Sequence, residues 1–484
     1  MLISEEVRTR FAPSPTGFMH VGNLRVALYD YLIAKQTKGK FVLRLEDTDQ
    51  NRLVEGAEAF IYESLSTFGL NFDEGPTVGG AFAPYRQSER MAAGLYKKYA
   101  EELVQKGAAY YCFCGKDEQE HDADECDVAP FAHYDRKCLK LSVAEIKAKL
   151  NAGEKYVIRQ KIPEGKTSFD DVLYGHIEVE NKELEDMILL KSDGFPTYNF
   201  ANVVDDHLMN ITHVVRGCEY LSSAPKYTLL YRAFGWDEPT YIHCPHITNE
   251  EHKKLSKRSG HSSVKNLLDM GYLPETIINF VALLGWSGDS EKEIYSLGEL
   301  IEHFDYKKVK KSSAVFDVAK LKWMNGEYLR AKPFEQFYAL IEKELKAALK
   351  GDFDYHELAE ILHPRLELAS DIGTLLDFIP SLPNYDKSIF INEKLKSTPE
   401  TSLDVLSKIT PILESAKNWN KDELIALIKQ FIESNALKNG LVLWPLRAAL
   451  SGKASSAGGA YELLIALKRT ESLARLKTAI SRLK

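Results

Sequence analysis

The sequence predicts an α/β protein in which a parallel β-sheet domain is followed by an all-helical C-terminal region. Two observations support this prediction. Residues 8–46 show a strand–helix–strand pattern, and beyond residue 325 the spacing of apolar residues is almost wholly helical. A chain of 484 residues is too long for one hydrophobic core. We therefore expect several domains.

The first strand covers residues 8–12 and ends at Pro13, because proline has no N–H to donate and its φ is restricted. A helix is expected from Gly22, since apolar residues recur at helical spacing after it. We expect Gly39 to end this helix and residues 41–46, FVLRLE, to form the next buried strand. Such a unit builds a parallel sheet with a right-handed crossover.

Five polar residues of this unit fall where a parallel sheet binds ligands, namely Arg10, Ser14, His20, Asn23 and Glu46. Ligands bind beyond the carboxyl ends of the strands, beside helix N-termini. The exposed N–H groups and the dipole at such a terminus favour phosphate. The sequence contains neither GxGxxG nor GxxxxGK[ST], so it lacks the fingerprint of a dinucleotide-dependent oxidoreductase. A nucleotide bound here would have to be held by a different sequence motif.

The composition is that of an ordinary globular protein, with 44% hydrophobic and 27% charged residues. The sequence has no run of 18 apolar residues, so no membrane-spanning helix is predicted. The first ten residues do not resemble a signal peptide, and we expect a cytoplasmic protein. The net charge of −8 is only weak evidence against nucleic-acid binding, because a local basic surface is sufficient for such binding.

Two segments occur in the order typical of one enzyme class. PSPTGFMHVGN, from Pro13, resembles the HIGH signature of class I aminoacyl-tRNA synthetases, with Asn23 in place of the second histidine. KKLSKRSG, residues 253–260, resembles their KMSKS loop. The segments RLEDTD, FPTYNFANVVDDH, VVRGCEYLSS and WPLRAALSGKASSAGGAYELL extend the likeness over nearly the whole chain and resemble bacterial glutamyl-tRNA synthetases.

The resemblance implies a ligase of protein biosynthesis with a Rossmann-like catalytic domain. Such an enzyme activates L-glutamate with ATP, for which Mg²⁺ is the counter-ion, and releases pyrophosphate. It then transfers the glutamyl group to the 3′ end of tRNA(Glu), and charging of tRNA(Gln) remains open. A monomer is expected.

The resemblance also implies a set of site residues. Those expected to bind glutamate are Arg10, Ala12, Ser14, Glu46, Tyr198, Asn202 and Arg216. Those expected to bind ATP are His20, Gly22, Asn23, Glu219, Lys254 and Lys257, of which His20, Lys254 and Lys257 are expected to be catalytic. The family often has two acidic residues after the Arg-Gly pair. In this chain the two positions hold Cys218 and Glu219, so only one of them is acidic. This difference leaves the role of Glu219 in contacting adenosine open.

The chemistry of the substrate explains these residue types. A carboxylate such as Glu46 can face the α-ammonium group of glutamate. The planar guanidinium of Arg216 or Arg10 can hold the side-chain carboxylate through two hydrogen bonds. Tyr198 and Asn202 are four residues apart and share one face if the segment is helical. His20 can donate to phosphate, and the two lysines can neutralise the charge on departing pyrophosphate.

Four of the six cysteines lie between residues 112 and 138, as expected of a zinc site. The family often has C-x-C followed by C-x-H, but Lys140 stands at the final position. YDRKC instead resembles the tyrosine-x3-cysteine form of a queuosine-glutamylating paralogue. The expected ligands of one structural Zn²⁺ are Cys112, Cys114, Tyr134 and Cys138, with Cys126, His121 or His133 as alternatives to the tyrosine.

Five regions are expected from the pattern and the resemblance. The catalytic domain comprises residues 1–88 and 196–250, and residues 89–195 form an inserted acceptor-binding domain with the zinc site. Residues 251–325 carry the KLSKR loop and contact the tRNA stem. Residues 326–384 and 385–484 form two helical anticodon-binding domains.

Two other functions share part of this pattern. The queuosine-modifying paralogue has the same fold but lacks the helical anticodon region, whereas this chain has a long helical C-terminal part. A non-catalytic tRNA-binding relative would be expected to lose His20, Lys257 or Glu46, and all three are present.

Overall fold

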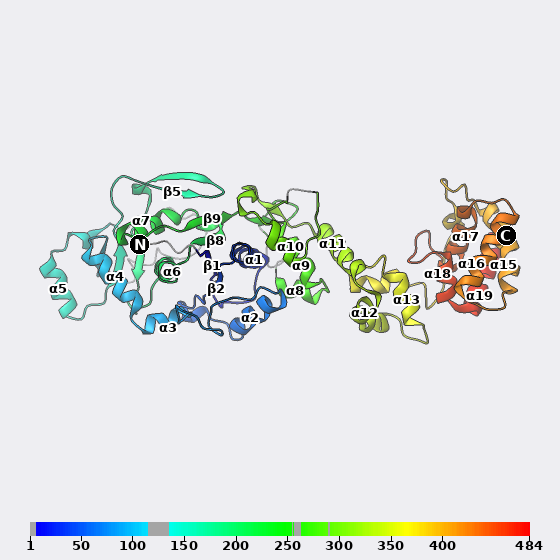
Figure 1. Ribbon diagram of the computed structural model, residues 1–484, viewed down its shortest axis with the longest axis horizontal. Coiled ribbons are helices and arrows are strands. Elements are labelled where there is room, and N and C mark those ends of the chain that lie inside the picture. The colour runs from blue at the N-terminus through cyan, green and yellow to red at the C-terminus, as the bar shows by residue number, and fades with distance from the viewer. Residues whose placement is uncertain (1–5, 115–134, 254, 256–262, 289–290) are drawn as a thin grey trace. The chain divides into compact units, whose positions relative to one another are not determined.

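The computed structural model describes residues 6–114, 135–253, 255, 263–288 and 291–484 (Figure 1). The chain divides into two compact units. The first comprises Met1–Leu268 and Ile277–Asp317, and the second comprises Asp269–Thr276 and Val318–Lys484. No helix among the described residues is both long enough and apolar enough to cross a membrane.

The first unit opens with the predicted strand–helix–strand arrangement. Its elements are β1 (Arg8–Phe11), α1 (Val21–Gln36) and β2 (Lys40–Leu43), and β1 pairs with β2 in parallel. Thr212 N–H donates to the Arg8 carbonyl at 2.9 Å and joins β1 to the start of β8 (His213–Gly217). Figure 1 shows β2, β1, β8 and β9 following one another beside α1.

The predicted end of α1 at Gly39 needs correction. Lys38, with φ 57°, is the left-handed residue, and Gly39 N–H reaches back to the Ala34 carbonyl at 2.8 Å. This is a Schellman ending in which lysine occupies the position that usually belongs to glycine. Gly39 serves another purpose, because a Cβ there would lie 1.9 Å from the Val7 carbonyl oxygen.

The strands β8 and β9 (Thr240–Cys244) are parallel, with Gly217 opposite Cys244. The hairpin of β5 (Lys166–Asp171) and β6 (Gly175–Glu180) extends their sheet, in the order β6-β5-β9-β8. A separate antiparallel sheet has the order β3-β4-β7. The bounds of the second sheet are β3 (Ala109–Cys112), β4 (Val157–Gln160) and β7 (Ile188–Leu190).

Helices cover these sheets, and two short strands, β10 (Ile247–Thr248) and β11 (Ala314–Val315), pair in parallel. A core of buried aromatic and aliphatic residues joins α4, α6, α7 and β9. The helices are α2 (Ala57–Thr67), α3 (Gln87–Ala92), α4 (Leu95–Gln105), α5 (Val143–Asn151), α6 (Tyr198–Leu208), α7 (Ala224–Phe234), α8 (Val264–Asp269), α9 (Pro274–Ala282) and α10 (Leu297–His303).

The second unit is helical among its described residues, as predicted. Apolar faces of its helices form one core, and the buried Arg475 donates to the carbonyls of Phe378, Ile379 and Leu450 at 2.8–3.0 Å. The helices are α11 (Val318–Ala331), α12 (Phe334–Ala348), α13 (Tyr355–Leu362), α14 (Ile372–Leu375), α15 (Pro399–Glu414), α16 (Lys421–Ser434), α17 (Asn439–Ser451), α18 (Ala460–Ala466) and α19 (Lys468–Leu483).

Candidate active site

A cavity of about 460 Å³ opens beyond the carboxyl ends of β1 and β8, beside the start of α1. It brings together most of the predicted site residues, although they come from three distant segments of the chain. Those that line it are Arg10, Ala12, Ser14, His20, Gly22, Asn23, Glu46, Tyr198, Arg216 and Glu219.

The turn after β1 is tied to the end of the β2 segment. Glu46 N–H donates to the Pro13 carbonyl at 3.0 Å, and Thr16 N–H donates to the Ser14 carbonyl at 2.8 Å. These bonds hold Ala12 and Ser14 against the cavity. The backbone of this turn is therefore set before any ligand enters.

His20 is the N-cap of α1. Its Nδ1 accepts a hydrogen bond from Gly22 N–H at 3.1 Å. A neutral imidazole whose Nδ1 accepts must carry its proton on Nε2, so Nε2 is a donor. The cavity thus has an imidazole N–H and the N-terminus of a 16-residue helix at one side, a combination that suits an anion.

Arg216 offers unpaired donors from a buried position. The residue is only 6% exposed, and its Nε and Nη1 have no hydrogen-bond partner among the described residues. Its guanidinium lies 4.8 Å from the ring centre of Tyr227, 5.6 Å from that of Tyr241 and 5.8 Å from that of Tyr220. The rings favour the cation, but they leave its planar donors in need of an acceptor.

Arg10 is in a different situation, since two of its donors are already occupied. Its Nε donates to Asp206 Oδ1 at 3.0 Å, and its Nη1 donates to the Val215 carbonyl at 3.3 Å. Arg44 Nη1 donates to the same Asp206 oxygen at 2.7 Å. Burial raises the pKa of Asp206, but Arg10, Arg44 and Arg216 more than offset this effect and hold it below its usual value.

Glu46 lies on the other side of this network. Its Oε1 accepts from Arg44 Nη2 at 3.1 Å, and its buried Oε2 has no partner among the described residues. Burial raises the pKa of Glu46 to about 7, although Arg44 and Arg10 oppose the change. A cation beside Oε2 would favour the ionised form.

Arg44 and Asp206 are site residues that were not predicted from the sequence. Both are buried and both orient groups that line the cavity. Asp206 could have been found, because it is four residues after Asn202 and eight after Tyr198, on the same helical face. Arg44 had a weaker signal, which was only its place two residues before Glu46 in a predicted strand.

Tyr198 and Asn202 both lie on helix α6, which is the condition for sharing one helical face. Only one of the two side chains lines the cavity. Tyr198 lines the cavity and stacks on Tyr220 with ring centres 5.5 Å apart. Asn202 is not among the lining residues. Its Nδ2 donates to the Tyr198 carbonyl at 3.0 Å, and its buried Oδ1 has no described partner.

Glu219 enters the cavity from the turn after β8. A Cβ on Gly217 would lie 2.2 Å from Glu219 Oε2, so the glycine makes room for this carboxylate. Lys254 and Lys257 lie outside the described residues. Leu255 lines the cavity, and Val264 N–H donates to the Met19 carbonyl at 3.1 Å. The described residues on both sides of 256–262 therefore contact the region of the cavity.

Three of the predicted metal ligands meet at the end of β3. The sulfurs of Cys112, Cys114 and Cys138 lie within 4.8 Å of one another, and those of Cys114 and Cys138 are 3.7 Å apart. Two sulfurs on a tetrahedral Zn²⁺ with Zn–S of about 2.3 Å would be about 3.8 Å apart. The cluster therefore fits zinc. Tyr134 and its alternatives Cys126, His121 and His133 lie outside the described residues.

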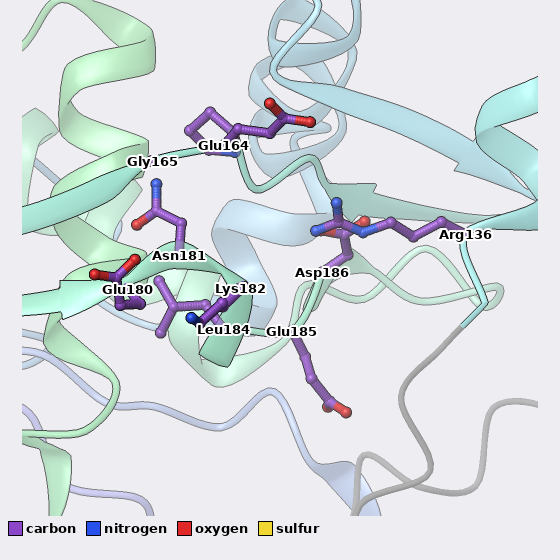
Figure 2. Close-up of a pocket in the computed structure, with 10 residues that line it drawn as sticks. Arg136, Glu164, Gly165, Glu180, Asn181, Lys182, Leu184, Glu185 and Asp186 are labelled. Atoms are coloured by element: carbon purple, nitrogen blue, oxygen red, sulfur yellow. The ribbon is translucent and has the colours of Figure 1, made fainter.

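A second cavity, of about 360 Å³, is lined by Arg136, Asp186 and residues near them (Figure 2). In Figure 2 Arg136 reaches towards Asp186, and their atoms are 2.6 Å apart. Asp186 also accepts from the Tyr110 hydroxyl and from Ile162 N–H, so its oxygens are already satisfied. The described residues that line this cavity include none of the buried, unpaired polar groups found at the first cavity.

Comparison with known proteins follows the same division of the chain. Residues 6–323 match the family model for the catalytic domain of class I tRNA synthetases (E and Q), and residues 330–480 match an anticodon binding domain. A glutamate–tRNA ligase of Clostridium botulinum strain Eklund 17B is 55% identical, and both chains are covered completely. One of Lachnoclostridium phytofermentans is 53% identical over 99% of each chain.

Solved structures with a similar fold are also glutamate–tRNA ligases. The glutamate tRNA ligase from Elizabethkingia meningosepticum CCUG26117, in complex with its amino acid, is 36% identical with a TM-score of 0.83. The glutamate-tRNA synthetase from Elizabethkingia anophelis is 35% identical with a TM-score of 0.84. Each likeness covers 99% of this chain and 100% of the other.

Proposed function

Because the chain belongs to the class I tRNA synthetases for glutamate and glutamine, we propose that it is a glutamate–tRNA ligase whose active site is the cavity beside α1. The observation that carries this proposal is the pairing, in one cavity, of the unpartnered guanidinium of Arg216 with the unpartnered carboxylate oxygen of Glu46. An amino acid with a second carboxylate supplies a complement to each.

Arg216 binds the side-chain carboxylate of glutamate. The planar guanidinium, whose Nε and Nη1 have no partner among the described residues, can form two parallel bonds to the two carboxylate oxygens through Nη2 and one of these nitrogens, which a point charge cannot do. Arg10 assists through its charge and holds Asp206 in place, since its Nε and Nη1 are already bonded. Glu46 Oε2 accepts from the α-ammonium group. Ala12, Ser14 and Tyr198 form the walls, and Asn202 supports Tyr198 from behind.

ATP lies at the start of α1. The α-carboxylate of glutamate attacks the α-phosphorus, the bond from phosphorus to the bridging oxygen breaks, and pyrophosphate leaves with that electron pair. His20 Nε2 donates to a phosphate oxygen, and Gly22 and Asn23 supply the helix terminus. Lys254 and Lys257 balance the charge on pyrophosphate. Glu219 faces the adenosine portion. Mg²⁺ accompanies ATP as its counter-ion.

The tRNA completes the reaction, because a hydroxyl at its 3′ end attacks the carbonyl of the adenylate and AMP leaves. The inserted region 89–195 holds the acceptor end, residues 251–325 contact the stem, and the helices of 326–384 and 385–484 bind the anticodon. Zinc held by Cys112, Cys114, Cys138 and Tyr134 is structural, since it fastens the end of β3 to residues after 134. A role in translation is consistent with the expected cytoplasmic location.

The test is ATP–pyrophosphate exchange with the purified protein. With tRNA present in the assay, exchange between ATP and pyrophosphate should occur only when glutamate is added. Charging of separately purified tRNA(Glu) and tRNA(Gln) then decides between one substrate and two. Transfer of glutamate to queuosine-containing tRNA at a modified base, without charging of either 3′ end, would instead identify the queuosine-modifying activity and contradict the proposal.

A further inference from the structure

Three metal-binding side chains meet at the rim of the proposed nucleotide site. The ligand atoms of Cys218, Glu219 and His246 all lie within 4.8 Å of one another, and His246 Nδ1 is 3.9 Å from Glu219 Oε2. They are separate from the cluster of Cys112, Cys114 and Cys138. The mechanism proposed above uses only Glu219.

The sheet explains why these residues meet. β8 and β9 are parallel and end together, with Gly217 opposite Cys244. Cys218 is the first residue after β8, and His246 follows β9 by two residues. Two adjacent strand ends therefore present a thiol and an imidazole to the same space, and Glu219 adds a carboxylate.

We propose that Cys218, Glu219 and His246 form a second metal site, which takes a thiophilic divalent cation such as Zn²⁺, Co²⁺ or Cd²⁺ and obstructs ATP when occupied. One sulfur, one nitrogen and one oxygen suit borderline-soft metals, whereas Mg²⁺ and Ca²⁺ prefer oxygen alone. The side chains of His246 and Glu219 are 46% and 48% exposed, so both can turn the short distance needed to reach a common ion.

The position of the site determines its effect. Glu219 and His246 line the cavity, on the side where adenosine is expected. A cation held there would occupy this space and would use the carboxylate assigned to adenosine. Its occupancy should therefore raise the KM for ATP. This consequence rests on the proposed function, whereas the metal site itself does not.

The site is tested by adding Co²⁺ to protein that retains its structural zinc. A thiolate ligand gives Co²⁺ a charge-transfer band in the near ultraviolet. We expect one additional Co²⁺ per chain with this band, and none in Cys218→Ser. His246→Ala should weaken the binding by more than about 10-fold, because even residues that only orient a ligand cost 10–100-fold. His176→Ala is the matched control, since His176 is exposed and pairs with Asp170 at 2.8 Å on the β5–β6 hairpin.

Exchange assays test the effect on ATP. Co²⁺ should raise the KM for ATP several-fold in the wild-type protein and in His176→Ala, but leave it unchanged in Cys218→Ser. The ratio with and without Co²⁺ is compared within each variant, so chelation of Co²⁺ by ATP is common to all. Absence of the charge-transfer band in the wild type, or its persistence in Cys218→Ser, would overturn the proposed metal site. Binding of Co²⁺ without any change in the KM for ATP would overturn the proposal that the bound cation obstructs ATP. If the wild-type protein shows no exchange even without Co²⁺, that result counts against the proposed function and not against the metal site.

Discussion

The Arg216 guanidinium lies 4.8 Å from the ring centre of Tyr227, and two of its nitrogens have no hydrogen-bond partner in the part of the chain that the structure describes. Nearby Arg10 and Arg44 share Asp206 instead. The aromatic surroundings hold the charge of Arg216 without using its in-plane donors. This difference makes Arg216, and not Arg10, the side chain that requires an acceptor from outside the protein.

Glutamate binding should weaken as the pH falls below 7. Burial raises the pKa of Glu46 to about 7, and protonation removes the negative charge that attracts the α-ammonium group. The KM for glutamate should rise about 10-fold for each pH unit below this value. Glu46→Gln should have a high KM that no longer depends on pH. Exchange kinetics between pH 5.5 and 8.5 measure this, and a flat wild-type profile would contradict it.

The same group should affect stability with a defined sign. The pKa of Glu46 is raised by folding, so the folded state binds the proton more tightly, and stability from this group is present below pH 4.5 and lost as the pH rises through about 7. Glu46→Gln should therefore gain stability relative to the wild type as the pH increases from 5 to 8. Urea unfolding at both pH values compares the two proteins.

Loss of Lys257 should impair adenylate formation far more than glutamate binding. Its expected partner is the pyrophosphate, whose negative charge grows only as the bond to phosphorus breaks. Removing one such charge contact typically costs about 3–4 kcal/mol in the transition state. Lys257→Ala should therefore lower the exchange rate at saturating substrates by a factor of about 100–1000. The adjacent Arg258→Ala serves as a control for loss of charge, and unchanged exchange in Lys257→Ala would refute the role.

The end of α1 allows a paired test of backbone strain and close packing. Lys38→Gly should keep or raise stability, because a left-handed conformation costs a non-glycine residue about 1–2 kcal/mol. Gly39→Ala should destabilise the protein by about 1–3 kcal/mol, since its Cβ would overlap the Val7 carbonyl. Thermal unfolding of both variants gives the comparison. Equal effects of the two substitutions would contradict the assigned roles.

Zinc should accompany the purified protein at about one tightly held ion per chain. Cys138→Ser should lose it, because Cys138 supplies one of the three clustered thiols. Cys244→Ala should retain it, since Cys244 is buried at the end of β9 and apart from the cluster. Elemental analysis after a mild chelator wash measures the metal. Zinc-free wild-type protein with all six thiols free would refute the site.

The sequence predicted the site best where the chemistry was local. His20 and Asn23 belong to the same turn as Gly22, and their place at a helix start followed from hydrophobic spacing. Asp206 and Arg44 were missed because their importance arises from a contact between α6 and the β2 segment, 162 residues apart in sequence. The end of α1 was misassigned for a similar reason. Gly39 is required by its distant neighbour Val7, whereas Lys38 takes the strained conformation.

The role of Arg216 in binding the side-chain carboxylate is tested by the selectivity of ATP–pyrophosphate exchange for glutamate over glutamine. The wild type, Arg216→Ala and Arg216→Lys are compared. Glutamine has nearly the same size but would leave a donor of Arg216 facing an NH₂ group. We predict strong preference for glutamate in the wild type, a large rise in the KM for glutamate and a narrowed preference in Arg216→Ala, little change in ATP affinity, and poor rescue by lysine. A glutamate KM in Arg216→Ala within about twofold of the wild-type value, a difference of ~0.4 kcal/mol, would contradict this role of Arg216 and make Arg10 the next candidate.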